Sequence, residues 1–230
     1  MRSLFLLGLG LVLVLAGCTA VTPPAGDAFR SGEVPYASIL LEEDAPRVAF
    51  YGDSYTLGTG ASDPSLRWSS IICAERGWQE FNPSVNGLGF VNNRATDGEG
   101  DLPALVIAND PSIVFNTMGL NDNFSYDRAA NQIRLRITED FTRLATALPD
   151  ARFIVVEPFW YTDRRPESVE VIIGWVRDAA AAIGADYIPG ASHWIEGHPE
   201  WMASDGLHPN DAGYAAMAAR MDAELTKLGL

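Results

Sequence analysis

The sequence predicts an α/β fold in which a central, mainly parallel, five-stranded sheet lies between two layers of helices. From Arg47 onward, short apolar runs alternate with longer segments whose apolar residues recur at helical spacing. The runs 112–117 and 152–157 each have an uninterrupted apolar centre, Ile-Val-Phe and Phe-Ile-Val-Val, as expected of strands buried on both faces. Because a helix between two strands returns the chain to its starting edge, this alternation predicts a parallel sheet in a three-layer α/β/α sandwich.

The elements follow in order along the chain. A strand over 48–51 ends at Gly52, and a helix over 64–76 starts at Pro64 with Ser62 or Asp63 as its cap. A weaker strand is predicted over 81–85, followed by the runs 112–117 and 152–157 and a last short strand over 186–189. Three more helices are indicated by apolar residues at helical spacing, namely Ile133, Ile137, Phe141, Leu144 and Leu148; Val169, Ile172, Ile173, Val176, Ala180 and Ile183; and Tyr214, Met217, Met221, Leu225 and Leu228.

The N-terminal residues have the pattern of an export signal. Arg2 precedes the apolar run 4–15, which is short for a transmembrane helix but typical of a signal-peptide core. The run ends in Leu-Ala-Gly-Cys18, which resembles the bacterial lipobox, in which the cysteine is lipid-modified and becomes the new N-terminus. We therefore predict a signal peptide over 1–17, a lipidated Cys18 with a flexible tether over 18–45, and a folded domain over 46–230. The alternative is an ordinary signal peptide that happens to contain Cys18.

The charge and the cysteine content exclude several classes of binding partner and a disulfide. The formal net charge of −14 argues against nucleic acid and against an anionic membrane surface, so the predicted contact with a bacterial membrane is through the lipid anchor only. Apart from Cys18 the chain has one cysteine, Cys73, which excludes a disulfide within the domain and is expected to be a small buried hydrophobe.

Chemistry is expected at the carboxyl ends of the strands. Four loops rich in Gly, Asp and Asn lie at that predicted edge, over 52–54, 86–90, 119–122 and 205–209. They contain one serine and one histidine that suit each other: a serine hydroxyl becomes a nucleophile when a histidine accepts its proton. We assign Ser54 as nucleophile and His208 as base. Asp205, three residues before His208 across a turn with Gly206, is placed to orient the imidazole and stabilise its charged form.

A tetrahedral intermediate also needs hydrogen-bond donors for its oxyanion. The backbone N–H groups of Ser54 and Gly89 and the side-chain amide of Asn121 are the predicted donors. No cofactor and no metal are needed for this chemistry. His193 and His198 are the remaining histidines, and neither has a convincing second ligand partner for a metal site.

In these four blocks the chain resembles the SGNH, or GDSL-type, serine hydrolases, which are named for a Ser, a Gly, an Asn and a His. Ser54, Gly89, Asn121 and His208 match them in order, with Asp205 as the partner of His208, and the resemblance covers about residues 47–228. It implies a flavodoxin-like sandwich and esterase or lipase activity. Two departures stand out: Tyr55 replaces the leucine of the GDSL form, and the second block also fits Gly87.

The substrate is less constrained. Trp160, Tyr161 and Trp194 lie near the predicted active edge and could form an aromatic platform for a sugar. We predict an esterase outside the cytoplasm that cleaves short-chain, above all acetyl, esters of carbohydrates or similar small esters, whether small molecules or polysaccharides. A lipid esterase or lysophospholipase, an acyltransferase using the same acyl-enzyme, and a binding lipoprotein with a degenerate site stay open. Asp53 and Asp122 are expected to hold loops.

Overall fold

The computed structural model describes residues 44–95 and 101–230, and it contains the predicted parallel sheet. The strands are β1 (Arg47–Tyr51), β2 (Gln79–Phe81), β3 (Ile113–Asn116), β4 (Arg152–Val156) and β5 (Asp186–Ile188). Their order across the sheet is β2-β1-β3-β4-β5, and every neighbouring pair is parallel. All carboxyl ends therefore lie at one edge, and the predicted fold class is confirmed.

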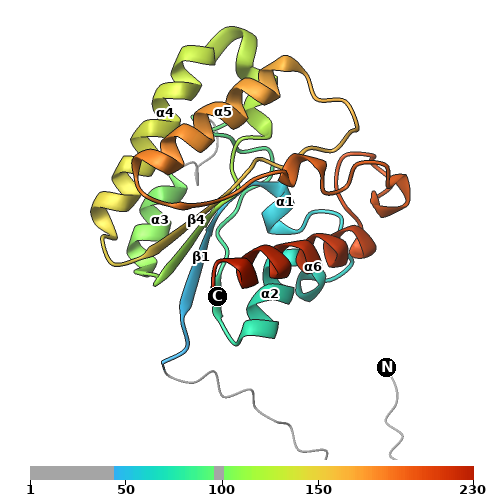
Figure 1. The fold of residues 1–230 in the computed structure, drawn as a ribbon. Helices are drawn as coiled ribbons and strands as arrows, with labels where there is room; N and C mark the ends of the chain where they lie inside the picture. Colours follow the sequence, from blue (N-terminus) through green and yellow to red (C-terminus); the bar gives the residue numbers. More distant parts are fainter. Residues whose placement is uncertain (1–43, 96–100) are drawn as a thin grey trace, which may run out of the picture. The chain divides into compact units, whose positions relative to one another are not determined.

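Helices cover both faces of the sheet (Figure 1). One face carries α2 (Trp68–Arg76) and α6 (Asp211–Lys227), and the other carries α3 (Leu102–Asn109), α4 (Tyr126–Ala147) and α5 (Glu167–Ala182). A single helical turn, α1 (Ser54–Leu57), follows β1, and short 3₁₀ turns are η1 (Pro64–Leu66), η2 (Asn121–Ser125), η3 (Ala191–His193) and η4 (Pro199–Trp201).

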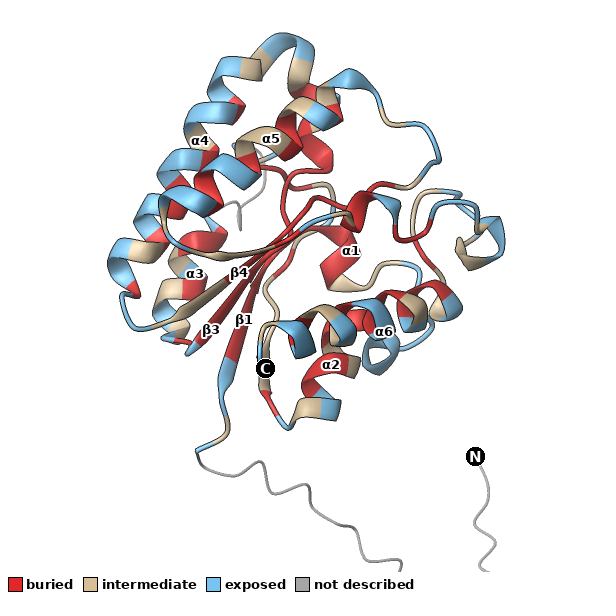
Figure 2. Cartoon of the chain, in the orientation of Figure 1, coloured by how far each residue is buried: buried red, intermediate tan, exposed pale blue. Residues whose placement is uncertain are grey.

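The sheet has one hydrophobic core on each face, because successive side chains of a strand point to opposite faces. Val48 and Phe50 of β1 pack with α2 and α6, whereas Ala49 and Tyr51 pack with α3, α4 and α5. All four are almost fully buried. Figure 2 shows that the central strands are largely buried and that the helices are buried mainly on the side that faces the sheet. A strand apolar on both faces is what the sequence predicts, because helices remove both faces from water.

Two predicted elements have different boundaries in the structure, and one helix was missed. The strand predicted over 81–85 is Gln79–Phe81, and the helix predicted from Pro64 starts at Trp68 after the 3₁₀ turn η1, which Asp63 caps. The helix α3 was not predicted. The predicted signal peptide and nearly all of the tether lie outside the described residues, and among the described residues no helix is long and apolar enough to cross a membrane.

Both ends of the described domain lie at the amino-terminal edge of the sheet. The described chain enters at Asp44, just before β1. At the other end, the carbonyl of Leu228 accepts a hydrogen bond of 2.7 Å from the side chain of Arg152, the first residue of β4. The loops predicted to carry chemistry lie at the opposite edge.

Candidate active site

The predicted nucleophile lies in a closely packed turn between β1 and α1. Ser54 is the first residue of α1, directly after β1, and only 4% of its surface is exposed. The carboxylate of Asp53 caps the turn by accepting from the N–H of Tyr55 at 3.0 Å. A Cβ on Gly52 would lie 2.5 Å from Thr117 Oγ1, so this position excludes any side chain. The sequence Gly-Asp-Ser therefore folds into one rigid strand-to-helix turn.

The predicted base and its partner are joined directly. His208 Nδ1 lies 2.7 Å from Asp205 Oδ2, while the other carboxylate oxygen accepts from the backbone N–H groups of Leu207 and His208 at 2.9 and 3.0 Å. Gly206 takes a positive φ of 64° and closes the turn. These hydrogen bonds, led by that from the His208 N–H, lower the pKa of Asp205 to about 2, so its carboxylate is charged at neutral pH.

Backbone contacts join the two ends of the segment 202–209, which carries Asp205 and His208. Met202 and Pro209 form an antiparallel bridge, and the N–H of Ala203 donates to the carbonyl of His208 at 2.8 Å. From the nucleophile side, the hydroxyl of Tyr55 donates to the carbonyl of Leu207 at 2.7 Å. Within the described residues neither Ser54 Oγ nor His208 Nε2 has a hydrogen-bond partner. A serine hydroxyl and an imidazole nitrogen that both lack partners are free to pair with each other when substrate binds.

Asn121 is brought to the nucleophile turn from the end of β3. Its side-chain nitrogen donates to the carbonyl of Leu88 at 2.9 Å and to Asp53 Oδ2 at 3.2 Å. Burial, with a smaller contribution from the nearby Asp122 carboxylate, raises the pKa of Asp53 to about 7. Asp53 thus connects the nucleophile turn to the predicted oxyanion amide.

The structure argues against Gly89 as an oxyanion donor. Its N–H donates to the carbonyl of Asn92 at 2.9 Å. A Cβ at this position would lie 2.6 Å from Asp122 Oδ2, so glycine is required here for the approach of that carboxylate. Asp122 in turn accepts from the N–H groups of Phe90, Val91 and Asn92 at 2.7, 2.8 and 3.2 Å. Asp53 and Asp122 hold loops, as expected.

Gly87, the alternative glycine in the second block, differs from Gly89 in its backbone conformation and hydrogen bonding. It adopts a positive φ of 71°, and no described residue accepts a hydrogen bond from its N–H. Arg94, a few residues further on, pairs with the buried Asp140 of α4, which also accepts from the hydroxyl of Tyr51 at 2.6 Å. The loop with Gly87 is thus held by Asp122 and by Asp140. The Arg94–Asp140 pair was not predicted, since nothing in the sequence connects two residues so far apart.

Two of the three predicted substrate residues are not available. Trp160 and Trp194 are 3% and 7% exposed and belong to the hydrophobic core. The indole N–H of Trp160 is satisfied inside the protein, by Thr162 Oγ1 at 2.9 Å and by the carbonyl of Arg164. Neither ring offers a free face to a sugar, which corrects the prediction for these two residues. Tyr161 is only partly buried and lines a cavity.

That cavity, of about 460 Å³, lies directly beside the turn of Asp205 and His208. It is formed by the segment after β4 and by the stretch between β5 and α6. Its walls mix apolar side chains with hydroxyl, carboxylate and imidazole groups, from Tyr161, Thr162, Asp163, Ile195, His198, Pro199, Met202, Ala203, Ser204 and Gly206. Within the described part of the chain, no group of three or more His, Cys, Asp and Glu side chains could hold a metal.

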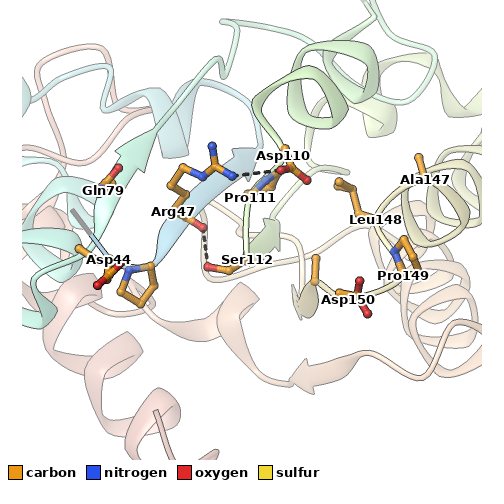
Figure 3. A pocket seen from close by; sticks show the side chains of 13 residues that line it. Asp44, Arg47, Gln79, Asp110, Pro111, Ser112, Ala147, Leu148, Pro149 and Asp150 are labelled. Carbon is orange, nitrogen blue, oxygen red and sulfur yellow. Dashed lines mark hydrogen bonds and ion pairs between the residues drawn. The ribbon is translucent and has the colours of Figure 1, made fainter. Parts of the chain in front are cut away.

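A larger cavity, of about 590 Å³, lies at the opposite edge of the sheet (Figure 3). It is bordered by residues that precede β1, β3 and β4, among them Asp44, Asp110 and Asp150. Arg47 pairs with Asp110 at 3.1 Å on its wall, and both side chains are exposed. It contains none of the predicted catalytic residues.

The comparison with protein families agrees with this geometry. Residues 50–216 match the GDSL-like lipase/acylhydrolase family, a span that includes Ser54, Asn121, Asp205 and His208. The chain belongs to this family. It is a serine carboxylic ester hydrolase. A curated member of similar sequence, the GDSL lipase Rv0518 of Mycobacterium tuberculosis, is 27% identical over 81% of this chain and 84% of its own length.

Several solved structures share the fold. TesA matches with a TM-score of 0.65 and 21% identity, over 79% of this chain and 99% of its own. A catalytic mutant of the acetylxylan esterase Axe2 from Geobacillus stearothermophilus matches with a TM-score of 0.56 and 16% identity, over 76% and 91%. At these identities the likeness concerns the fold.

Proposed function

We propose that this GDSL-type hydrolase cleaves its ester through an acyl-enzyme on Ser54, with His208 as general base and Asp205 as its orienting carboxylate. The observation that carries the proposal is the Asp205–His208 contact of 2.7 Å, in a turn that Tyr55, the residue after Ser54, binds directly. His208 accepts the proton of Ser54 as its oxygen attacks the carbonyl carbon, and then returns it to the leaving alcohol. Water repeats the cycle on the acyl-enzyme.

For the oxyanion we propose the N–H groups of Ser54 and Gly87 and the amide of Asn121, with Gly87 in place of Gly89. The N–H groups of Ser54 and Gly87 have no acceptor among the described residues, which leaves them available to an oxyanion. Asn121 donates at present to Asp53 and Leu88. Its 3.2 Å contact with Asp53 is the longer of the two, and we expect it to be exchanged for the oxyanion in the transition state.

We further propose that the substrate is a short acyl, above all acetyl, ester of a hydroxyl-rich leaving group. The cavity beside the Asp205–His208 turn supports this, because Asp163, His198 and Ser204 supply acceptors and donors for hydroxyl groups while Tyr161 supplies an apolar ring. Axe2, which has the same fold, is by its name an acetylxylan esterase.

A lipid ester is the second candidate, and one observation favours it. Phe124, in the 3₁₀ turn that begins at Asn121, leaves 50% of its surface exposed. Residues three apart in a 3₁₀ turn lie on the same face of the turn, so an exposed apolar ring is carried on the same short turn as Asn121. The similar protein from Mycobacterium tuberculosis is named a lipase. An acyltransferase would use the same acyl-enzyme with an alcohol as acceptor.

The proposed location is outside the cytoplasm, attached to a bacterial membrane through a lipid on Cys18. Its support is the sequence Leu-Ala-Gly-Cys18 after an apolar run. A lipidated cysteine would provide stable anchoring without a membrane-spanning helix.

A panel of soluble aryl esters from acetyl to octanoyl, with acetylated xylan and a lysophospholipid, tests the substrate class. We expect kcat/KM to fall as the acyl chain lengthens, and acetate to be released from the polysaccharide. Each methylene placed in an apolar slot would contribute about 0.8 kcal/mol, so a lipid esterase would improve steeply along the same series. Rising efficiency beyond butyryl below the micelle limit would favour the lipid ester. Ser54→Ala serves as the blank throughout.

A further inference from the structure

Tyr55 stands where the GDSL form has leucine, and it contacts both sides of the candidate site. It follows Ser54 in α1, is fully buried, and its hydroxyl donates to the carbonyl of Leu207 at 2.7 Å. Leu207 is covalently joined to His208, so one side chain spans from the residue after the nucleophile to the residue before the base. The two residues are 152 positions apart in sequence.

The rest of Tyr55 is fixed. Its N–H donates to Asp53 Oδ1 at 3.0 Å, and its carbonyl accepts from the indole of Trp68 at 3.0 Å. Its ring stacks on Phe159 with centroids 5.7 Å apart and lies 6.0 Å from the ring of His208. A donor held at its backbone and its ring has little freedom to move, so the position of its oxygen sets the position of the carbonyl that it binds.

The accepting side is part of the Asp205 turn. The N–H of His208, which belongs to the same peptide unit as the carbonyl that Tyr55 binds, donates to Asp205 Oδ1, and so does the preceding N–H, that of Leu207. Burial raises the pKa of the Tyr55 hydroxyl well above its ordinary value, so it remains protonated and donates at every working pH. Leucine, as in the GDSL form, could fill the space but could not donate.

We propose that Tyr55 is a positioning residue: its hydroxyl fixes the Leu207–His208 segment relative to Ser54 and thereby holds the imidazole in line with the serine. This rests on the proposed roles of Ser54 and His208. Loss of the hydroxyl leaves the Asp205–His208 contact intact but frees the turn to shift as a unit. Because a shift of about 1 Å between reacting groups can cost up to about a hundredfold in rate, the effect belongs in kcat and not in substrate affinity.

Tyr214 provides a matched control. It too is fully buried in the same core cluster, and its hydroxyl donates to a backbone carbonyl, that of Thr59, also at 2.7 Å. Tyr55→Phe and Tyr214→Phe therefore remove the same kind of buried hydrogen bond, and they should lower Tm by similar amounts. Only the first removes a contact with the segment that carries His208.

The experiment measures kcat and KM for an aryl acetate, the rate of Ser54 modification by an aryl sulfonyl fluoride, and Tm. For Tyr55→Phe we expect kcat and the modification rate to fall about tenfold, with KM within about twofold. Tyr214→Phe should keep kcat within about twofold. Tyr55→Leu, which restores the GDSL residue, should lose at least as much kcat as Tyr55→Phe.

Two results would overturn the proposal: a Tyr55→Phe enzyme with kcat within twofold of the wild type, or a Tyr214→Phe enzyme that loses as much as Tyr55→Phe. Ser54→Ala separates this from the proposed function. If Ser54→Ala is inactive and Tyr55→Phe is unimpaired, only the positioning role fails. If Ser54→Ala retains turnover, the nucleophile assignment fails, and the Tyr55 proposal fails with it.

Discussion

At the scale of single residues, the proposed mechanism depends most on the Asp205–His208 pair. His208→Ala removes the proposed base, and we expect kcat for an aryl acetate to fall by about 10³-fold or more with the fold intact. Asp205→Asn should lower kcat by about 10²–10⁴-fold, because an amide favours the wrong imidazole tautomer. Glu196→Gln is the matched control, since Glu196 contacts His193 in the same i, i+3 arrangement outside the site. Circular dichroism and steady-state kinetics on the same preparations decide the outcome, and near-full turnover by either site variant contradicts the assignment.

A second prediction at this scale concerns the buried carboxyl of Asp53. Its pKa in the folded protein is raised from about 3.8 to about 7, so the folded state prefers the protonated form. The stability that this provides is complete below about pH 4 and is lost as pH rises through about 7, with an upper limit of about 4 kcal/mol. Asp122, whose pKa is raised to about 6, acts in the same direction.

Asp53→Asn keeps an oxygen that caps α1 and removes the ionisation. We therefore expect Tm to fall less between pH 5 and pH 8 in this variant than in the wild type. Asp63→Asn is the control, because Asp63 caps η1 in the same way but is exposed, with a lowered pKa. Parallel Tm–pH curves for the wild type and Asp53→Asn would show that Asp53 is already charged at pH 5.

Gly89 shows what the sequence can and cannot predict about single residues. The Gly-x-Gly pattern places two glycines in the right loop, but only the hydrogen bond from Gly89 to Asn92 and the approach of Asp122 tell their roles apart. The three aromatic residues near the active edge raise the same difficulty. Trp160 and Trp194 are core residues, and a single sequence does not distinguish an indole that packs from one that binds a sugar.

At the scale of elements, the loop after β2 depends on one carboxylate. In Gly89→Ala the new methyl would lie 2.6 Å from Asp122 Oδ2, which forces the loop or the carboxylate to move. We expect a loss of unfolding free energy of about 2–4 kcal/mol, together with a fall in kcat, because Gly87 belongs to the same loop.

The double variant Gly89→Ala/Asp122→Ala tests the cause. Asp122→Ala alone removes the acceptor of three backbone N–H groups and should be strongly destabilising. Because the clash requires the carboxylate, adding Gly89→Ala to Asp122→Ala should lower the free energy of unfolding only a little further. Urea unfolding of the single and double variants measures this non-additivity. Additive losses would mean that the methyl group clashes with something other than Asp122.

Predictions of elements succeeded where the pattern was long and periodic. The apolar spacing in α4, α5 and α6 indicated those helices, and the uninterrupted apolar centres of β3 and β4 indicated buried strands. The helix α3 was missed because its sequence, Leu-Pro-Ala-Leu-Val-Ile-Ala-Asn, is apolar all round and has no helical period. The strand β2 has three half-buried residues, which leaves little pattern to place its ends.

At the scale of the whole molecule, anchoring and catalysis should be separable. Cys18→Ala removes the proposed lipidation site, so we expect the protein to leave the membrane fraction while kcat/KM for a soluble ester stays within about twofold. The reason is that Cys18 lies well before the first strand, in a part of the sequence that contributes no proposed catalytic residue. Fractionation and activity are measured on the same extract. Unchanged membrane association of the variant would count against lipidation.

The placement of the two ends of the described domain has a practical consequence. Entry at Asp44 and the contact of Leu228 with Arg152 put both ends at one pole of the sheet, and the proposed catalytic loops lie at the other pole. A solid support, a fluorescent protein or a carbohydrate-binding module joined at either end therefore faces away from the catalytic pole. The domain is suited to oriented immobilisation from either of these two ends, with the proposed catalytic loops directed away from the support.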